Sequence, residues 1–173
     1  MVSDYDYMTR ALSLAQKGHP APNPCVGAVL VKDGKIIGEG YHQRMGSAHA
    51  EIVAIHASEK HGPVADGATL YITLEPCAHF GKTPPCIDSI IFSGITRVVI
   101  GCKDQNPVSG DGIGALKEAG IDVEVGVLGD ECAAFYAPFF HYIRTKMPLV
   151  TLKAAMTLDR KIAVKRGEQL SIT

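Results

Sequence analysis

The sequence lacks an apolar run long enough to cross a bilayer, and it lacks an excess of basic residues. Its 173 residues include 17 Lys and Arg against 18 Asp and Glu, a formal net charge of −1. Proteins that bind a phosphate backbone carry a basic face, so this balance argues against a nucleic-acid partner. The missing apolar run argues against a membrane partner.

A signal-like opening is also missing, because residues 1–6 are polar and acidic. The five cysteines are an odd number. Both features favour a cytoplasmic, reducing location, where cysteines serve as metal ligands or core residues rather than in disulfides. The chain has no internal repeat, and its 46% hydrophobic and 20% charged residues are ordinary for one globular domain.

Hydrophobic spacing predicts an α/β order of elements. The expected helices cover residues 4–17, 49–61, 85–93, 113–119 and 131–144, and the expected strands cover 26–31, 36–41, 68–74, 97–101, 123–127 and 149–153. Asp33-Gly34 predicts a hairpin turn between the first two strands. The later alternation of strands and helices predicts parallel strands and helices on both faces of a mixed sheet.

Two clusters of side chains have the chemistry of a metal site. His49 and Glu51 lie two positions apart at the start of an expected helix, and Cys77 precedes Cys86 by nine positions. One imidazole and two thiolates suit zinc, and three protein ligands leave a fourth position for water. Zinc lowers the pKa of that water toward neutrality. Such a water could attack the ring carbon that carries an amine group. The Glu51 carboxylate beside it would then move protons to the ring nitrogen of that substrate and to the leaving amine.

The order His49-Ala50-Glu51 and then Pro76-Cys77 resembles the zinc-deaminase pattern of H-x-E followed by P-C-x-x-C. The gap between the cysteines is eight residues here, where that pattern has two. Two other interpretations stay open. Cys77 and Cys86 could be unrelated core cysteines, or the zinc could be structural and leave Glu51 without a role.

A longer match is more specific. The segment from Glu75 to Cys86 reads EPCAHFGKTPPC, and PNPCVGAV begins at Pro22 while DQNPV begins at Asp104. These segments resemble the deaminase domain of the riboflavin-biosynthesis deaminase–reductases. The resemblance implies a cytidine-deaminase-like α/β/α sandwich with a mixed central sheet. It also implies hydrolytic deamination of 2,5-diamino-6-ribosylamino-4(3H)-pyrimidinone 5′-phosphate to 5-amino-6-ribosylaminouracil 5′-phosphate and ammonia.

The same resemblance assigns roles to individual residues. It implies zinc at His49, Cys77 and Cys86, with Glu51 as the proton shuttle. Amide and carboxylate groups suit the edge of a diaminopyrimidinone, and a cation suits a ribose phosphate. The implied substrate contacts are Asn23, His42, His79, Lys82, Asp104 and Asn106.

The sequence departs from the family pattern at a few of these positions. Gln105 stands where the family has Pro, Asp111 stands where it often has Lys, and Lys82 replaces the commoner Arg. Lys keeps the charge of Arg but loses its bidentate fork. We expect these departures to affect affinity more than reaction type. Asp104 and Asn106 are also expected to form an Asx-type turn before Pro107.

The C-terminal segment resembles the opening of the family's NADPH-dependent reductase domain. We expect a deaminase domain over residues 1–146 and a tail, or truncated start of a reductase-like domain, over 147–173. No NADPH binding is expected, and both a homo-oligomer and a separate reductase are compatible with the sequence. The competing functions are a nucleoside or nucleic-acid base deaminase and a zinc-stabilised scaffold without activity.

Overall fold

The computed structural model describes residues 2–59, 65–79, 85–158 and 160–161. Every predicted helix is present, and five of the six predicted strands are, with ends shifted by a few residues. The elements in chain order are α1 (Asp4–Ala15), β1 (Gly27–Lys32), β2 (Lys35–Tyr41), α2 (Ala50–Glu59), β3 (Thr69–Leu74), α3 (Cys86–Phe92), β4 (Arg97–Cys102), the 3₁₀ helix η1 (Pro107–Ser109), α4 (Gly112–Glu118), β5 (Asp122–Val125) and α5 (Gly129–Thr145).

The five strands form one mixed sheet in the order β2-β1-β3-β4-β5. β1 runs antiparallel to β2 and β3, whereas β3, β4 and β5 are parallel to one another. The β1–β2 hairpin turns at Asp33 and Gly34, whose φ angles of 51° and 71° are the left-handed values that a two-residue turn requires. The predicted mixed sheet and hairpin are therefore confirmed.

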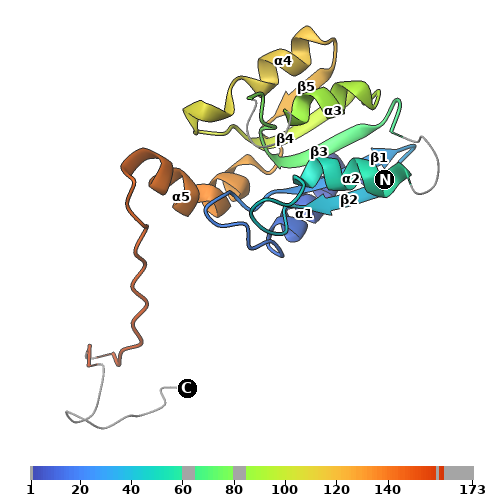
Figure 1. Cartoon of the computed structure of the whole chain (residues 1–173). Helices are drawn as coiled ribbons and strands as arrows, with labels where there is room; N and C mark the ends of the chain where they lie inside the picture. The colour runs from blue at the N-terminus through green and yellow to red at the C-terminus, as the bar shows by residue number, and fades with distance from the viewer. Residues whose placement is uncertain (1, 60–64, 80–84, 159, 162–173) are drawn as a thin grey trace.

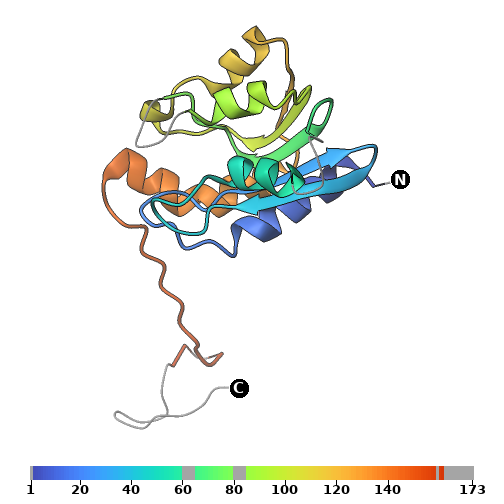
Figure 2. The same ribbon diagram turned by 45° about the vertical axis from the view of Figure 1, so that its right-hand side comes forward.

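Helices cover both faces of the sheet (Figures 1 and 2). Leu30, Leu70 and Ile100 pack in a core cluster with residues of α2, α3 and α4. Their strand neighbours Val31 and Tyr71 belong to a cluster with α1, as the alternation of side chains along a strand requires. The result is the predicted three-layer α/β/α sandwich. None of the described helices is long and apolar enough to cross a membrane.

Two glycines of β2 let α2 approach the sheet closely. A Cβ atom at Gly38 would collide with the backbone oxygen of Ala54, and one at Gly40 would collide with that of Ala50. α2 begins directly after His49 and carries Glu51. The small residues of β2 therefore set the position of the helix that bears Glu51 and directly follows His49.

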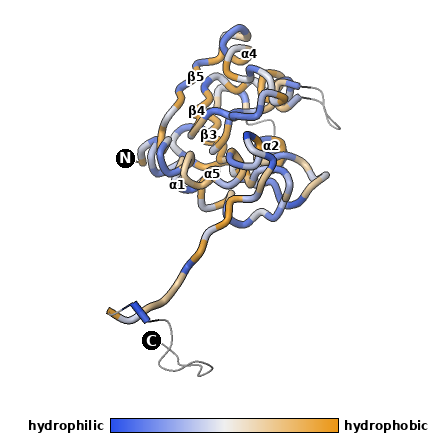
Figure 3. The backbone as a smooth tube through the Cα atoms, turned by 90° about the vertical axis from the view of Figure 1, so that its left-hand side faces the viewer, coloured by the Kyte–Doolittle hydropathy of each residue, from blue (hydrophilic) through white to orange (hydrophobic). Residues whose placement is uncertain are grey.

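The predicted strand at residues 149–153 is wrong. These residues form no strand in the structure, and Val150 and Leu152 are 84% and 90% exposed. The described tail leads away from the sheet in Figure 1, and Figure 3 shows that much of it is apolar. An apolar pattern alone does not make a strand, because a strand also needs a neighbour to pair its backbone groups.

Candidate metal centre and active site

Three side chains from different elements converge at the carboxyl end of β3. His49 precedes α2, Cys77 follows β3, and Cys86 is the first residue of α3. His49 Nδ1 lies 3.0 Å from Cys86 Sγ and 3.8 Å from Cys77 Sγ. The three donor atoms all lie within 4.8 Å of one another. Tetrahedral zinc bonds of about 2.0–2.3 Å place ligand atoms roughly 3.5 Å apart, so these residues could hold a zinc ion.

The two thiols and the imidazole already interact electrostatically. The Cys86 thiol hydrogen-bonds Cys77 and lowers the pKa of Cys77 to about 4, while the pKa of Cys86 is raised by the same contact and by burial. The hydrogen bond with Cys77 also raises the pKa of His49. The cluster therefore shares protons among groups that a divalent cation would bind in deprotonated form.

Glu51 lies beside these donors and is 2% exposed. Burial raises the pKa of its carboxyl group, partly offset by a hydrogen bond with Cys86. Within the described chain no Lys, Arg or His forms an ion pair with Glu51. A buried carboxyl group whose pKa is raised from its ordinary range suits proton transfer near neutral pH.

A cavity of about 400 Å³ opens over these groups and is lined by His49, Glu51 and Cys77. The structure thus brings together the residues that the sequence predicted as ligands and proton shuttle. Lys82 lies outside the described residues. The cavity wall also includes the other five predicted substrate contacts: Asn23, His42, His79, Asp104 and Asn106.

His42 is only 3% exposed, and both of its ring nitrogens have partners. Nδ1 lies 3.1 Å from the Ala48 carbonyl oxygen, and Nε2 lies 3.3 Å from Asn23 Nδ2. Because a carbonyl oxygen only accepts, Nδ1 carries the proton and Nε2 accepts from the Asn23 amide. Burial also lowers the pKa of His42, which favours this neutral ring. The Asn23 side chain is thereby oriented with its Oδ1 left to accept from another group.

His79 offers a further polar atom at the cavity. Its Nδ1 is buried and has no hydrogen-bond partner in the part of the chain that the structure describes. Buried polar atoms are almost always hydrogen-bonded. His79 itself lines the cavity, so a small rotation of its ring would bring this atom to a bound ligand.

Asp104 and Asn106 form the predicted Asx-type turn. Asp104 Oδ1 accepts from the Asn106 backbone N–H at 2.9 Å, and Asn106 Oδ1 accepts from the Val108 N–H at 3.2 Å. The departure at Asp111 has a structural role, since its Oδ1 accepts from the Gly114 N–H at 2.8 Å and caps α4. These bonds shape the segment that borders the cavity.

Sequence reasoning missed two polar residues that support the cavity. Glu75 is buried and accepts backbone N–H groups from Asp104 and Ile113. Tyr136 of α5 donates to the Cys25 carbonyl at 2.8 Å, next to the strand that follows Asn23. The position of Glu75 at the end of a strand, within the matched EPC segment, was a usable signal. Tyr136 gave none, because its partner lies 111 positions away.

The remaining cysteines are only partly as predicted. Cys132 is fully buried, as a small core residue should be, whereas Cys25 and Cys102 are half-buried. All five cysteines are free thiols. No disulfide therefore competes with the Cys77–Cys86 cluster for its sulfur atoms.

Comparison with known proteins finds relatives whose names agree with the resemblance seen in the sequence. The chain is 53% identical over 174 residues to the riboflavin biosynthesis protein RibD of Aquifex aeolicus, covering 98% of this chain and 48% of that protein. The structure of a diaminohydroxyphosphoribosylaminopyrimidine deaminase/5-amino-6-(5-phosphoribosylamino)uracil reductase from Thermotoga maritima superimposes with a TM-score of 0.93 at 52% identity, covering 98% of this chain and 49% of that one. The chain thus spans about half the length of these relatives.

A structure of a shortened relative matches over most of its length. A C-terminal deletion mutant of the Aspergillus oryzae Rib2 deaminase in complex with DARIPP is 29% identical with a TM-score of 0.61, covering 71% of this chain and 84% of that one. The family model for the cytidine and deoxycytidylate deaminase zinc-binding region matches residues 1–102, a stretch that includes His49, Glu51, Cys77 and Cys86. The fold is thus cytidine-deaminase-like, as predicted, and the chain belongs to the cytidine and deoxycytidylate deaminase zinc-binding family.

Proposed function

We propose that this chain hydrolytically deaminates 2,5-diamino-6-ribosylamino-4(3H)-pyrimidinone 5′-phosphate, releasing 5-amino-6-ribosylaminouracil 5′-phosphate and ammonia. The observation that carries the proposal is the buried carboxyl group of Glu51 beside three converging metal donors in one cavity. The names of the Thermotoga and Aspergillus relatives support the choice of substrate.

His49, Cys77 and Cys86 would hold the zinc ion. Zinc bound there would supply a Lewis acid that lowers the pKa of a water molecule toward neutrality. Within the described residues only these three side chains form such a cluster. Three protein ligands are typical of catalytic zinc sites, whereas structural sites are closed by a fourth, so the donor set favours catalysis over a scaffold role.

Glu51 would move the protons of the reaction. It takes a proton from the attacking water and delivers protons to the ring nitrogen and then to the leaving amine. In the overall reaction water is consumed, the ring C–NH₂ bond is replaced by a carbonyl group, and ammonia leaves. Its burial beside the three metal donors, in the wall of the same cavity, places Glu51 for this role.

The polar atoms of the cavity wall would recognise the substrate. Asn23 Oδ1 is oriented by His42 to accept from an amine or ring N–H. His79 Nδ1 is buried without a described partner, and Asp104 and Asn106 line the same cavity as His79. Lys82 would bind the phosphate, and this assignment rests on the sequence resemblance.

The proposal extends to the organisation of the chain. Residues 1–146 would form the deaminase domain, and 147–173 would be a tail or part of a reductase-like unit. The exposed apolar residues Val150 and Leu152 support this division. A separate reductase and a homo-oligomer are both compatible with the proposal. A reducing cytoplasm would keep Cys77 and Cys86 available as thiolates.

Ammonia release from three substrates tests the proposal. The zinc-loaded chain is incubated with the diaminopyrimidinone ribose phosphate, with cytidine and with single-stranded DNA. We expect turnover with the first substrate and background with the others. Preferential release from cytidine or DNA would favour a nucleoside or nucleic-acid base deaminase, and no release from any of them would favour a scaffold.

A further inference from the structure

Glu75 is a buried carboxylate that the proposed chemistry does not use. It follows β3 directly, and its own N–H continues the parallel pairing by donating to the Cys102 carbonyl at 3.0 Å. Its side chain is 9% exposed, and no Lys, Arg or His of the described chain forms an ion pair with it. A buried carboxylate without a cation is costly unless hydrogen bonds satisfy it, so its partners indicate its purpose.

The two carboxylate oxygens bind the two ends of one segment. Oε2 accepts the Asp104 backbone N–H at 3.2 Å, and Oε1 accepts the Ile113 backbone N–H at 3.1 Å. Between these two anchors lies the loop that carries Asp104 and Asn106, both of which line the cavity. One side chain therefore fixes the start and the end of a loop that borders the candidate active site.

The bonds within the loop do not by themselves place it against the metal donors. The turn at Asp104 and Asn106 closes on its own backbone, and the Ser109 hydroxyl donates to Asp104 Oδ2. Among the hydrogen bonds of the described residues, those of Glu75 and of the Ala78 N–H, which donates to the Ser109 carbonyl at 2.8 Å, join it to the segment that contains Cys77. Gly110 and Gly112 also pack closely against Ala78 and Pro76. The carboxylate thus couples the shape of the loop to the position of the metal site.

We propose that Glu75 is a positioning residue, whose carboxylate holds the 104–113 loop so that Asp104 and Asn106 face the ligand in the cavity. This inference rests on the proposed function for the identity of that ligand. A neutral amide cannot replace the carboxylate, because the two N–H groups bond to different oxygens of Glu75, and in Gln the NH₂ group, which only donates, would face one of them.

Steady-state kinetics of Glu75→Gln test the role. We expect KM for the diaminopyrimidinone phosphate to rise between about 10-fold and 10²-fold, with a much smaller change in kcat and unchanged zinc content, because His49, Glu51 and the two cysteines keep their places. A purely structural role would lower thermal stability and leave KM at the wild-type value, and that result overturns the proposal. Should Glu75→Gln not fold, Glu75→Asp is measured instead. It keeps both acceptor oxygens on a shorter stem, so its KM is expected to exceed the wild-type KM by less than about 10-fold.

Glu118→Gln is the matched control. It makes the same change of side chain at the exposed end of α4 and touches neither bond of Glu75. We expect its KM to match the wild type, and an equal rise in KM would show that loss of a carboxylate charge on this side of the fold suffices, which contradicts a specific role for Glu75. Amide hydrogen exchange should accelerate in Glu75→Gln at Asp104 and Ile113 and stay unchanged in α5. Unchanged exchange at both amides would likewise overturn the proposal.

A binding measurement separates this inference from the proposed function. Substrate affinity is compared between Glu51→Gln and Glu51→Gln/Glu75→Gln, in which turnover is expected to be slow enough for binding to be measured. A weaker Kd in the double variant supports positioning, and equal Kd values overturn the role of Glu75 alone. If the wild type neither binds nor deaminates the pyrimidine phosphate, the proposed function fails and the ligand role of Glu75 fails with it.

Discussion

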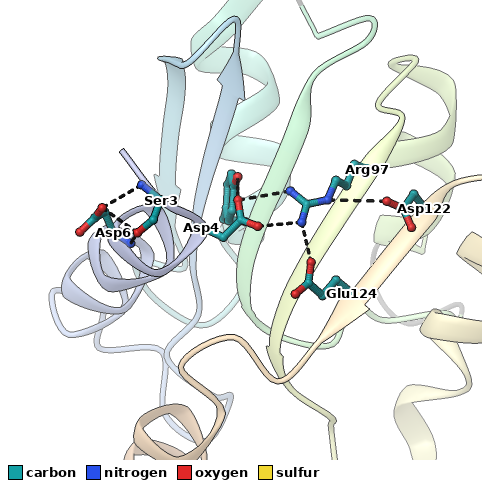
Figure 4. A network of polar contacts seen from close by, with 7 residues as sticks. Ser3, Asp4, Asp6, Arg97, Asp122 and Glu124 are labelled. Carbon is teal, nitrogen blue, oxygen red and sulfur yellow. Dashed lines mark hydrogen bonds and ion pairs between the residues drawn. The ribbon is translucent and has the colours of Figure 1, made fainter. Parts of the chain in front are cut away.

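The two ends of the parallel strands both gather charged and titratable side chains, but they arrange them differently. At the amino ends, Arg97 of β4 lies between Asp4, Asp122 and Glu124 (Figure 4). Each of these charges has an opposite charge as its partner. At the carboxyl ends, Glu51 and Glu75 are buried and form no ion pair with any described Lys, Arg or His, and Cys77 and Cys86 cluster with His49 as free metal donors. Charges that satisfy one another stabilise a fold, whereas groups left for an outside partner indicate a binding site at the strand ends, where ligands of α/β proteins bind.

The largest effect on the difference between the two strand ends is expected from removing one metal donor. We expect Cys77→Ser to lose zinc and, with it, ammonia release, because two remaining ligands do not hold zinc in a catalytic geometry. Metal analysis and turnover of the same preparation measure both effects. Cys102→Ser is the control, since Cys102 is half-buried and outside the cluster. Equal zinc content in the two variants would refute the assignment of Cys77.

Glu51→Gln should separate metal binding from proton transfer. We expect zinc content to stay at the wild-type level while kcat falls by about 10²–10⁴-fold, the range of general acid–base catalysis. Glu59→Gln, an exposed position at the end of the same helix, should keep wild-type turnover. A Glu51→Gln protein that retains full turnover would show that another group moves the protons.

The Arg97 network should affect stability and leave chemistry untouched. Arg97→Lys is expected to lower the free energy of unfolding by about 1 kcal/mol, since the contacts are partly exposed and Lys loses the fork that spans several carboxylates. Urea unfolding measures this change, and ammonia release should stay at the wild-type rate. A loss of turnover in the folded variant would show that the amino ends of the strands also contribute to catalysis.

The same network predicts a pH dependence. Hydrogen bonds from Arg97 and Tyr71 lower the pKa of Asp4 from its ordinary value of 3.8. A depressed carboxyl pKa adds stability that is present above the unfolded pKa and is lost as pH falls through the folded one. The difference in unfolding free energy between wild type and Asp4→Asn should therefore be full at about pH 6 and shrink below about pH 3.8. A difference that grows on acidification would contradict this.

The smallest effect is expected from the tail. Deleting residues 148–173 removes exposed apolar side chains that pack on no described core cluster. We expect the shortened protein to keep the zinc content, turnover and melting temperature of the full chain. A large loss of any of these would show that the deaminase domain does not end near residue 146.

Local signals and long-range contacts explain what the sequence could predict. The helix pattern and Asp33-Gly34 are local signals, and the predicted helices and hairpin are present. His49 and Cys86 lie 37 positions apart, but the residue types and order of His49, Glu51, Cys77 and Cys86 match a known pattern, and the predicted cluster is present. The bond from Glu75 to Ile113 and the ion pair from Arg97 to Asp4 join residues 38 and 93 positions apart, and no local pattern marks them. The failed strand at residues 149–153 shows the converse, since its apolar pattern is correct for a strand but has no partner in the described chain.

Zinc titration of the metal-free protein tests the central claim most directly. The protein is stripped with a chelator, Zn²⁺ is added back in steps, and ammonia release from the diaminopyrimidinone phosphate is measured at each step. The account predicts that activity rises with added zinc and reaches a plateau near one ion per chain, about the occupancy of a single three-ligand site. Activity that is independent of zinc, or no activity at full occupancy, would contradict it.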